Sequence, residues 1–234
     1  MAWQIIKTSL NFIFNNFAIA LRVSILPYTA YFAILIVIDT SDFAQQSRFF
    51  SLAGVLAALF FGAWIAVGWH RYILNGDTPN SWIPGLHWQN LRSYILKLFF
   101  LVVVLVVSAL PFILVAFVTM QSVPVITNFS LVFIPFVAGL FFFRFGLVLP
   151  AAALDQPLSF GISWRATGEI SGAVLITIVF VTLFNGVLTS IGTAMPYGPV
   201  SILWAYAAGW MQAMLGVSVL TTLYGYLIEK RDLY

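Results

Sequence analysis

The sequence contains 234 residues, of which 62% are hydrophobic and only 7% are charged. Soluble domains carry about 25% charged residues, so this composition excludes an ordinary water-soluble fold. Basic residues give a net charge of +3 but are spread singly along the chain, which does not favour nucleic-acid binding. Cys is absent, which excludes disulfides, thiolate metal sites and a Cys nucleophile. The composition predicts an all-α, polytopic membrane helix bundle that forms one domain over residues 1–234.

The first expected element is an amphipathic helix over residues 3–17. Trp3, Ile6, Leu10 and Phe14 recur there at helical spacing, while Lys7 and two asparagines are offset from them. This pattern is typical of a helix that lies in the membrane interface. The alternative is that the segment extends the first crossing. A cleaved signal peptide is not expected, because polar residues interrupt the apolar region and no small-residue cleavage site follows it.

Six long apolar stretches follow. About 20 helical residues cross a hydrocarbon core of about 30 Å. The sequence therefore predicts crossings near residues 20–38, 51–73, 94–118, 130–153, 170–191 and 199–227. Six crossings return both termini to the same side of the membrane.

The basic residues are distributed unequally across this topology. Among them, Arg48 alone falls in the connections that follow the first, third and fifth crossings. The other nine fall on the side of the termini: Lys7, Arg22, Arg71, Arg92, Lys97, Arg144, Arg165, Lys230 and Arg231. The positive-inside rule identifies that side as cytoplasmic. We therefore expect a multi-pass protein of the bacterial inner (cytoplasmic) membrane with both termini in the cytoplasm.

The two connections on the cytoplasmic side share a pattern. In each, an Asp-x-Pro sequence ends a long crossing, because Pro disfavours helical geometry in the residue before it and has no N–H to donate. A Trp and an Arg follow, which is typical of a short interfacial helix. The first copy contains Asp77, Pro79, Trp88 and Arg92, and the second contains Asp155, Pro157, Trp164 and Arg165. A repeated helix–interfacial loop–helix unit is one interpretation, and two ordinary cytoplasmic loops is the other.

Small residues recur at every fourth position in two of the predicted crossings. In membranes such faces let helix backbones approach closely, which is a main source of helix association. The first stripe comprises Gly54, Ala58, Gly62 and Ala66, and the second comprises Ala205, Gly209 and Ala213. Packing within the chain is the expected use, and a dimer interface is the alternative.

Five arginines are candidate contacts for lipid headgroups: Arg22, Arg71, Arg92, Arg144 and Arg165. Arg144 is the most informative of them, because apolar residues flank it inside a predicted crossing. A charge at that depth is costly and must face the bundle interior, find a partner or reach the headgroups. Asp155, Glu169 and a lipid phosphate are its candidate partners.

No catalytic, cofactor or metal site is predicted. His70 and Arg71 form a polar cluster at the end of the second crossing, where anchoring in the interface is the expected role. A bis-His haem is disfavoured because the other histidine, His87, does not lie on an opposing crossing. A metal site of the two histidines with Asp77 is also disfavoured, because the spacing matches no ligand motif.

Three segments carry a resemblance to a known family. They are Arg144-Phe-Gly-Leu-Val-Leu-Pro-Ala-Ala-Ala-Leu-Asp-Gln-Pro-Leu-Ser159 with Trp164-Arg165, then Trp69-His-Arg-Tyr72, and finally Leu223-Tyr-Gly-Tyr-Leu-Ile-Glu229. Together they resemble the bacterial six-span proteins labelled after the membrane domain of glycerophosphoryl diester phosphodiesterases. Members that carry a phosphodiesterase have it in an attached soluble domain. The resemblance therefore implies a membrane topology and not the phosphodiesterase activity.

The expected function is that of a non-catalytic inner-membrane protein, not an enzyme. It is either an accessory or scaffold subunit of a larger membrane complex or a factor that organises the membrane. Membrane lipids and other integral membrane subunits are the expected partners. The alternative function is a lipid or small-molecule transporter that uses intramembrane arginines to attract a phosphate headgroup.

Overall fold

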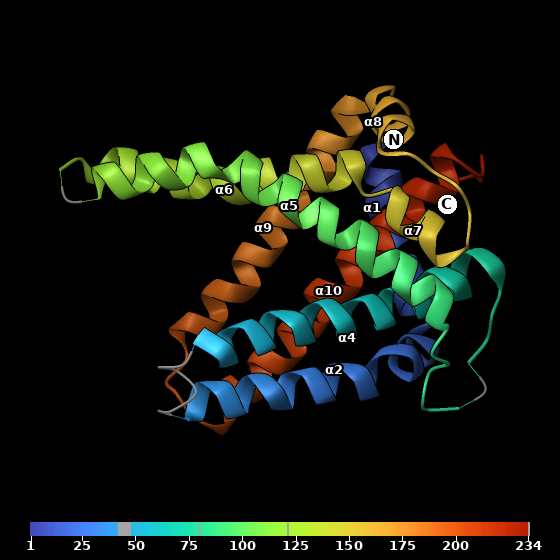
Figure 1. Ribbon diagram of the computed structural model, residues 1–234, viewed down its shortest axis with the longest axis horizontal. Helices are drawn as coiled ribbons and strands as arrows, with labels where there is room; N and C mark the ends of the chain where they lie inside the picture. The colour runs from blue at the N-terminus through green and yellow to red at the C-terminus, as the bar shows by residue number, and fades with distance from the viewer. Residues whose placement is uncertain (42–47, 80, 121, 234) are drawn as a thin grey trace.

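The computed structural model describes residues 1–41, 48–79, 81–120 and 122–233. Within these ranges the chain forms helices and no strands (Figure 1). The helices are α1 (Ala2–Asn15), α2 (Phe17–Thr40), α4 (Arg48–Asn75), α5 (Trp88–Thr119), α6 (Pro124–Phe145), α7 (Val148–Ala153), α8 (Phe160–Gly168), α9 (Ser171–Ala194) and α10 (Pro199–Leu227). The predicted all-α helical bundle is confirmed.

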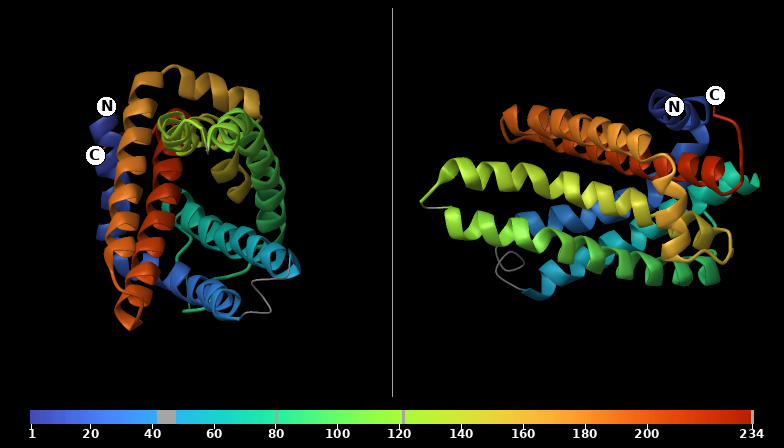
Figure 2. Two further views of the ribbon diagram at one scale, coloured as in Figure 1. Left: turned by 90° about the vertical axis from the view of Figure 1, so that its left-hand side faces the viewer. Right: turned by 90° about the horizontal axis from the view of Figure 1, so that it is seen from above.

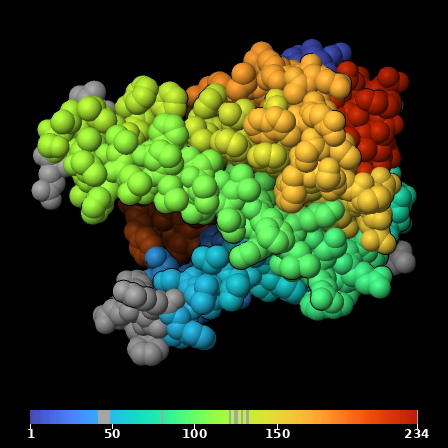
Figure 3. All heavy atoms as spheres, turned by 45° about the horizontal axis from the view of Figure 1, so that its top comes forward, coloured from blue at the N-terminus to red at the C-terminus, as the bar shows by residue number. Residues whose placement is uncertain are grey.

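The long helices form three hairpins, α2–α4, α5–α6 and α9–α10. Figure 1 shows the turning points of all three hairpins at its left, which we call the hairpin end, and both termini at the opposite end, which we call the terminal end. Figure 2 shows the two termini close together from both further directions. Figure 3 shows a hollow between the α5–α6 hairpin and the α2–α4 hairpin.

Five helices, α2, α4, α5, α9 and α10, are long and apolar enough to cross a membrane, judged by their length and composition over the described residues. The chain is a multi-pass membrane protein. In α6, a helix of 22 residues, the apolar segment of Phe133–Phe145 is shorter. The side chain of Arg48, the basic residue expected on the outer side, lies outside the part that the structure describes.

Helix α1 is separate from the first long helix. The chain changes direction at Asn16, and Figure 1 shows α1 running across the bundle and not along α2. Its buried face consists of Ile5, Ile6, Ser9 and Ile13 and packs mainly against α10. Trp3 and Phe14 of the predicted apolar face are exposed on the protein surface, at 67% and 60%. In an interfacial helix this leaves two aromatic rings for the lipid.

The predicted crossing at 130–153 is not one helix. Helix α6 ends at Phe145, a turn contains Gly146 and Leu147, and α7 continues to Ala153. Helix α7 is fully buried among α4, α5 and α10, and its three alanines permit this close approach. A helix break at membrane depth is tolerated where protein surrounds it.

The two connections on the terminal side differ more than the repeated pattern predicts. In the second copy, Trp164 and Arg165 belong to the separate nine-residue helix α8. In the first copy, Trp88 is the first residue of the long helix α5, and Arg92 follows in the same helix. The predicted interfacial helix of the first copy is therefore wrong. No Gly or Pro follows Arg92 to break the helix before its apolar segment.

Helices α4, α7 and α10 end in the same way. Each is followed by a residue in the left-handed region, at Gly76, Asp155 and Lys230 respectively. The next N–H then donates back into the helix, for example from Gln156 to the carbonyl of Ala151 at 2.8 Å. Such turns satisfy carbonyls that the helix leaves free. The Asp-x-Pro signals therefore mark real helix ends, with the reversal at Gly76 in the first copy and at Asp155 in the second.

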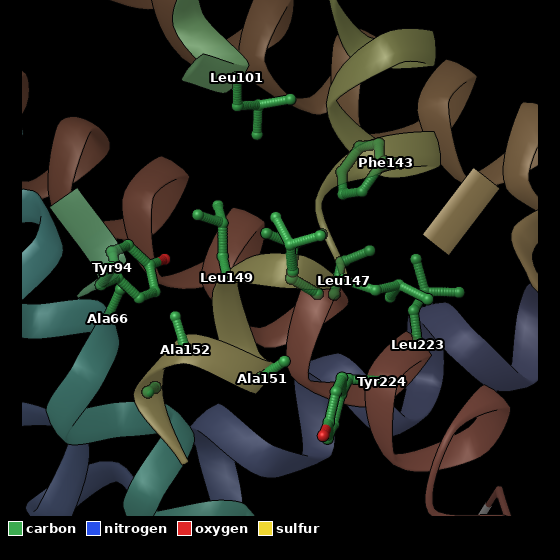
Figure 4. Close-up of a cluster of buried hydrophobic side chains, with 14 of the residues drawn as sticks. Ala66, Tyr94, Leu101, Phe143, Leu147, Leu149, Ala151, Ala152, Leu223 and Tyr224 are labelled. Carbon is green, nitrogen blue, oxygen red and sulfur yellow. The ribbon is translucent and has the colours of Figure 1, made fainter. Parts of the chain in front are cut away.

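The main core lies at the terminal half of the bundle. Figure 4 shows residues of α4, α5, α6, α7 and α10 converging there, including Ala66, Tyr94, Phe143, Leu149 and Leu223. Nearly the whole final third of α10 is buried, which makes it the central element of this half. A second cluster around Trp69 and Trp210 joins α1, α2, α4 and α10.

Candidate functional site

A row of hydroxyl groups on α10 connects three helices in the core. Ser218 accepts a hydrogen bond from Trp69 Nε1 at 2.9 Å. The Thr222 hydroxyl lies 2.9 Å from that of Ser9 on α1. Thr221 lies between them in sequence, and all three residues are buried on one side of the helix. These hydroxyls were not among the residues expected from the sequence, although their spacing of three and four residues within an apolar helix is a visible signal.

His70 belongs to this core and not to the interface. Its side chain is fully buried, and Nδ1 lies 2.8 Å from Thr221 Oγ1. The Thr221 hydroxyl in turn donates to the carbonyl of Val217, so the imidazole supplies the proton of the shared bond. Tyr94 lies on the other side, with its hydroxyl 3.5 Å from Nε2. The expected role as an interface anchor is corrected, because burial between α5 and α10 removes this ring from the headgroup region.

Two arginines bind carbonyls at helix ends. Arg71 pairs with Asp77 at 2.5 Å and donates to the carbonyl of Ala153 at the end of α7, which Asn90 also reaches at 3.0 Å. Arg231 donates to the carbonyls of Ile73 and Leu74 at the end of α4. The last carbonyls of a helix are free acceptors and carry the negative end of its dipole, so a cation is favourable there. These two basic residues of the terminal end join helices to one another.

Arg144 lies at the end of α6 and packs against α8 and α9. Its guanidinium carbon is 4.0 Å from the centre of the Trp164 ring, and Nη1 donates to the Ser171 hydroxyl at 2.9 Å. The same ring contacts Phe145, with the centroids 4.8 Å apart. A cation over the face of a Trp ring is a favourable arrangement. Within the described residues, neither Asp155 nor Glu169 forms an ion pair with Arg144, and Trp164 and Ser171 take the place of these two acids. A lipid phosphate as a further partner stays a prediction.

Helix α8 also caps α6. Ser163 is fully buried, and its hydroxyl donates to the carbonyl of Arg144 at 2.8 Å. The N–H of Leu147, just after the helix break, lies 3.3 Å from the same hydroxyl oxygen. One Ser therefore satisfies both backbone groups on the two sides of the turn.

Replacing Ser163 by Ala is expected to lower the free energy of unfolding by about 1 kcal/mol. The carbonyl of Arg144 loses its shorter hydrogen bond and keeps the one from the Thr167 hydroxyl at 3.2 Å, and the buried N–H of Leu147 loses its acceptor. Unfolding in mild detergent with increasing dodecyl sulfate measures this difference. Ser190, which is exposed on α9, is the matched control, and its replacement by Ala is expected to have almost no effect. Equal effects at the two positions would contradict the capping role of Ser163.

The other three of the five candidate arginines, Arg22, Arg92 and Arg165, are exposed. Arg22 lies over the ring of Trp82, with the guanidinium carbon 5.6 Å from the ring centre. No hydrogen bond or ion pair joins the side chain of Arg92 or Arg165 to any described residue. The structure therefore divides the five candidates into Arg71 and Arg144, which are engaged inside the bundle, and Arg22, Arg92 and Arg165, whose charges face outward.

The small-residue stripes are used unevenly. A Cβ on Gly54 would lie 3.2 Å from Ile38 of α2, and Ala66 is buried in the main core, while Ala58 is half-buried between them. Gly62 has open space where its Cβ would be. On α10, Gly209 lies directly against the Tyr28 hydroxyl, whereas Ala205 and Ala213 are exposed. Each stripe thus combines contacts within the chain with open positions.

His87 and Asp77 lie near each other on the terminal side but do not form a metal centre. Burial lowers the pKa of the His87 imidazole, and the charge of Arg71 lowers it further, whereas Asp77 opposes both. Across residues 1–41, 48–79, 81–120 and 122–233, no group of three or more His, Asp or Glu side chains is arranged to hold a metal ion.

Comparison of the chain with protein-family models, with curated proteins and with solved structures finds no match.

Proposed function

We propose that this chain is a non-catalytic subunit of a larger membrane complex, in which it acts as an accessory or scaffold protein. The observation that supports this proposal most directly is that polar side chains within the bundle contact other helices of the same chain. His70, Arg71, Arg144 and Arg231 are engaged by partners from other helices of the same chain. Polar residues inside membranes are costly and usually serve either a substrate path or helix association. Here their contacts favour helix association.

Open small residues support docking of a second membrane protein. Gly62 is exposed near the middle of α4, and no atom lies within 4 Å of the position of its Cβ. Ala58 lies one turn away on the same helix. Helices in lipid gain little from apolar contact alone, so such small-residue positions are where a neighbouring helix approaches closely. In this proposal, the partner is another integral membrane subunit.

The proposed setting is the bacterial inner membrane, with the terminal end in the cytoplasm. The exposed Arg22, Arg92 and Arg165 all belong to that end, where anionic headgroups attract cations. Membership of the glycerophosphoryl diester phosphodiesterase membrane-domain family stays a prediction from the sequence.

Replacing Gly62 by Leu is expected to remove the partner without unfolding the chain. The open space accepts the side chain, but a helix packed on this face would be pushed away. If the substitution weakens the free energy of association with the partner by about 1.4 kcal/mol, the affinity falls about tenfold, and the amount of recovered complex falls with it. The measurement is purification from native membranes in mild detergent, followed by mass spectrometry of the proteins that are recovered with the chain.

Gly172 provides the matched control, because it is also exposed with open space around it but lies at the start of α9. Gly172→Leu should leave the complex intact. Recovery of the unsubstituted chain without any stoichiometric protein would overturn the accessory role. If that lone chain carried one enriched phospholipid, the alternative function in lipid handling would replace it, with the three exposed arginines as its headgroup contacts.

A further inference from the structure

A long apolar groove lies between α1, α2, α9 and α10. Its volume is about 420 Å³, within the range of roughly 300–1,000 Å³ that is usual for small-molecule sites. Leu10 and Phe14 of α1 and Leu21 of α2 line it, together with a row on α10 that extends from Leu203 to Leu215. Phe14 and Leu203 are 60% and 67% exposed, so the groove opens to the surroundings of the bundle.

Two aromatic residues in the walls of this groove, Trp210 and Tyr206, carry a polar group, and both groups are already hydrogen-bonded to α2. The Trp210 indole N–H donates to Ser24 at 2.7 Å, and the Tyr206 hydroxyl lies 2.7 Å from that of Thr29. The other lining side chains are hydrocarbon, apart from the thioethers of methionine. A ligand that fits these walls must therefore be apolar along its whole length, since any polar group on it would lose its hydrogen bonds to water.

The length of the groove matches one layer of a bilayer. Leu203 and Leu215 are 12 residues apart on α10, which corresponds to about 18 Å at 1.5 Å per residue. Half of a hydrocarbon core of about 30 Å is about 15 Å. A single extended acyl chain therefore has the length and the polarity that the groove accepts.

Positive charge lies beside the α1 end of the groove. Lys7 is exposed and lies two turns before Phe14, so the helix places it on the face of Phe14 and not offset from that residue as expected from the sequence. Arg22 follows the lining residue Leu21, and its guanidinium lies over the ring of Trp82, outside the groove. The first acidic residue of the chain is Asp39, at the far end of α2. A ligand with a hydrocarbon chain in the groove would place its polar end near these two cations. The acid beside α1 is Asp232 of the C-terminal segment, which lies near Thr8 and Phe12 together with Lys230 and Arg231, so the surroundings of α1 keep an excess of positive charge. This charge pattern favours an anionic headgroup.

We propose that this groove holds one acyl chain of an anionic phospholipid, with the headgroup beside Lys7 and Arg22. The inference does not depend on the accessory role, because a bound lipid is compatible with a lone chain and with a subunit of a complex. It differs from the headgroup contacts considered above, because the groove selects the hydrocarbon chain and the two cations select the charge.

The test reconstitutes the full chain in vesicles of equal parts phosphatidylglycerol and phosphatidylcholine and then measures the phospholipid retained per chain in mild detergent by native mass spectrometry. We expect one retained phosphatidylglycerol. Ala207→Trp places an indole in the groove and should reduce retention at least fivefold. Ala213 is also exposed on α10 but does not line the groove, so Ala213→Trp should retain the lipid. Lys7→Gln combined with Arg22→Gln should abolish the preference for phosphatidylglycerol while a phospholipid is still retained.

Equal retention by the Ala207→Trp chain and the unsubstituted chain would overturn the proposal, as would retention of no lipid by the unsubstituted chain.

A second measurement avoids substitutions altogether. Phosphatidylglycerol with a photoreactive group in its acyl chain should label peptides of α1 and the 203–215 segment of α10 more than those of α5, whose Val106 and Val107 are exposed apolar residues. Equal labelling of α5 would show only bulk lipid contact, and cross-linking of the groove to a protein would show that another occupant fills it. Either outcome would overturn the proposal.

Discussion

Replacing Trp69 by Ala is expected to lower the free energy of unfolding by about 3 kcal/mol, the largest effect predicted for a single side chain of this protein. The Trp69 ring is fully buried and joins α4 to α10 through its bond to Ser218. Its removal leaves a cavity and takes the donor from the Ser218 hydroxyl. Replacing a buried Trp by Ala lowers the free energy of unfolding by about 3–5 kcal/mol in water-soluble proteins. The lower limit applies here, because lipid is nearly as apolar as the core and the transfer part of the loss is small.

Trp88 is the matched control for this substitution. It is 60% exposed at the start of α5, so Trp88→Ala should change the free energy of unfolding by less than about 0.5 kcal/mol. Unfolding by dodecyl sulfate in mild detergent, followed by the loss of helical circular dichroism, measures both variants. A Trp69→Ala chain as stable as the Trp88→Ala chain would mean that the contact between α4 and α10 does not stabilise the fold.

Replacing Gly146 by Ala is expected to destabilise the fold by about 1–3 kcal/mol through overpacking. Gly146 lies at the turn between α6 and α7, where a Cβ would collide with the carbonyl oxygen of Phe142 and lie 2.7 Å from Leu220 of α10. Its φ of −67° is ordinary, so the requirement for Gly is steric and not conformational. The Leu220 side chain can move, but the Phe142 backbone cannot move without disturbing the end of α6.

The control for Gly146 is expected to change stability in the opposite direction. Gly216 lies within α10, and its Cβ position has no neighbour within 4 Å. Gly216→Ala should therefore stabilise the chain by up to about 1 kcal/mol, because Ala has the higher helix propensity. The two variants are compared in the same unfolding titration. If Gly146→Ala were also stabilising, the close approach of the α6–α7 turn to α10 would be contradicted.

Trp69→Ala and Ser163→Ala test two contacts of one arrangement in which polar atoms hold the terminal half together. Ser163 closes the end of α6, Arg71 the end of α7 and Arg231 the end of α4. The hydroxyl row of α10 connects α1 and α4. At the hairpin end, helices of adjacent hairpins diverge, and Figure 3 shows the resulting hollow. Stability is therefore expected to be concentrated in the terminal half.

The sequence by itself determined the class of the protein and the approximate places of its helices. Apolar length and the Asp-x-Pro signals are local properties, and both act through the backbone's need to satisfy its own hydrogen bonds in lipid. The break after the second long helix, at Gly76, follows from the Asp77-x-Pro79 signal. The separate first helix follows from the helical spacing of its apolar residues, another local property. The special character of Arg144 was also visible, because a charge within an apolar run has a cost wherever the chain folds.

Only the tertiary structure decided which polar groups meet. Arg144 stacks on Trp164 and not on an acidic residue, and His70 meets Thr221, which is 151 positions away in the chain. The split of the fourth predicted crossing at Gly146 depends equally on α8, whose Ser163 satisfies the backbone freed by the break. The physical reason is that these partners come from other helices. Periodicity within one helix specifies which side chains share a face, but packing between helices decides what that face contacts.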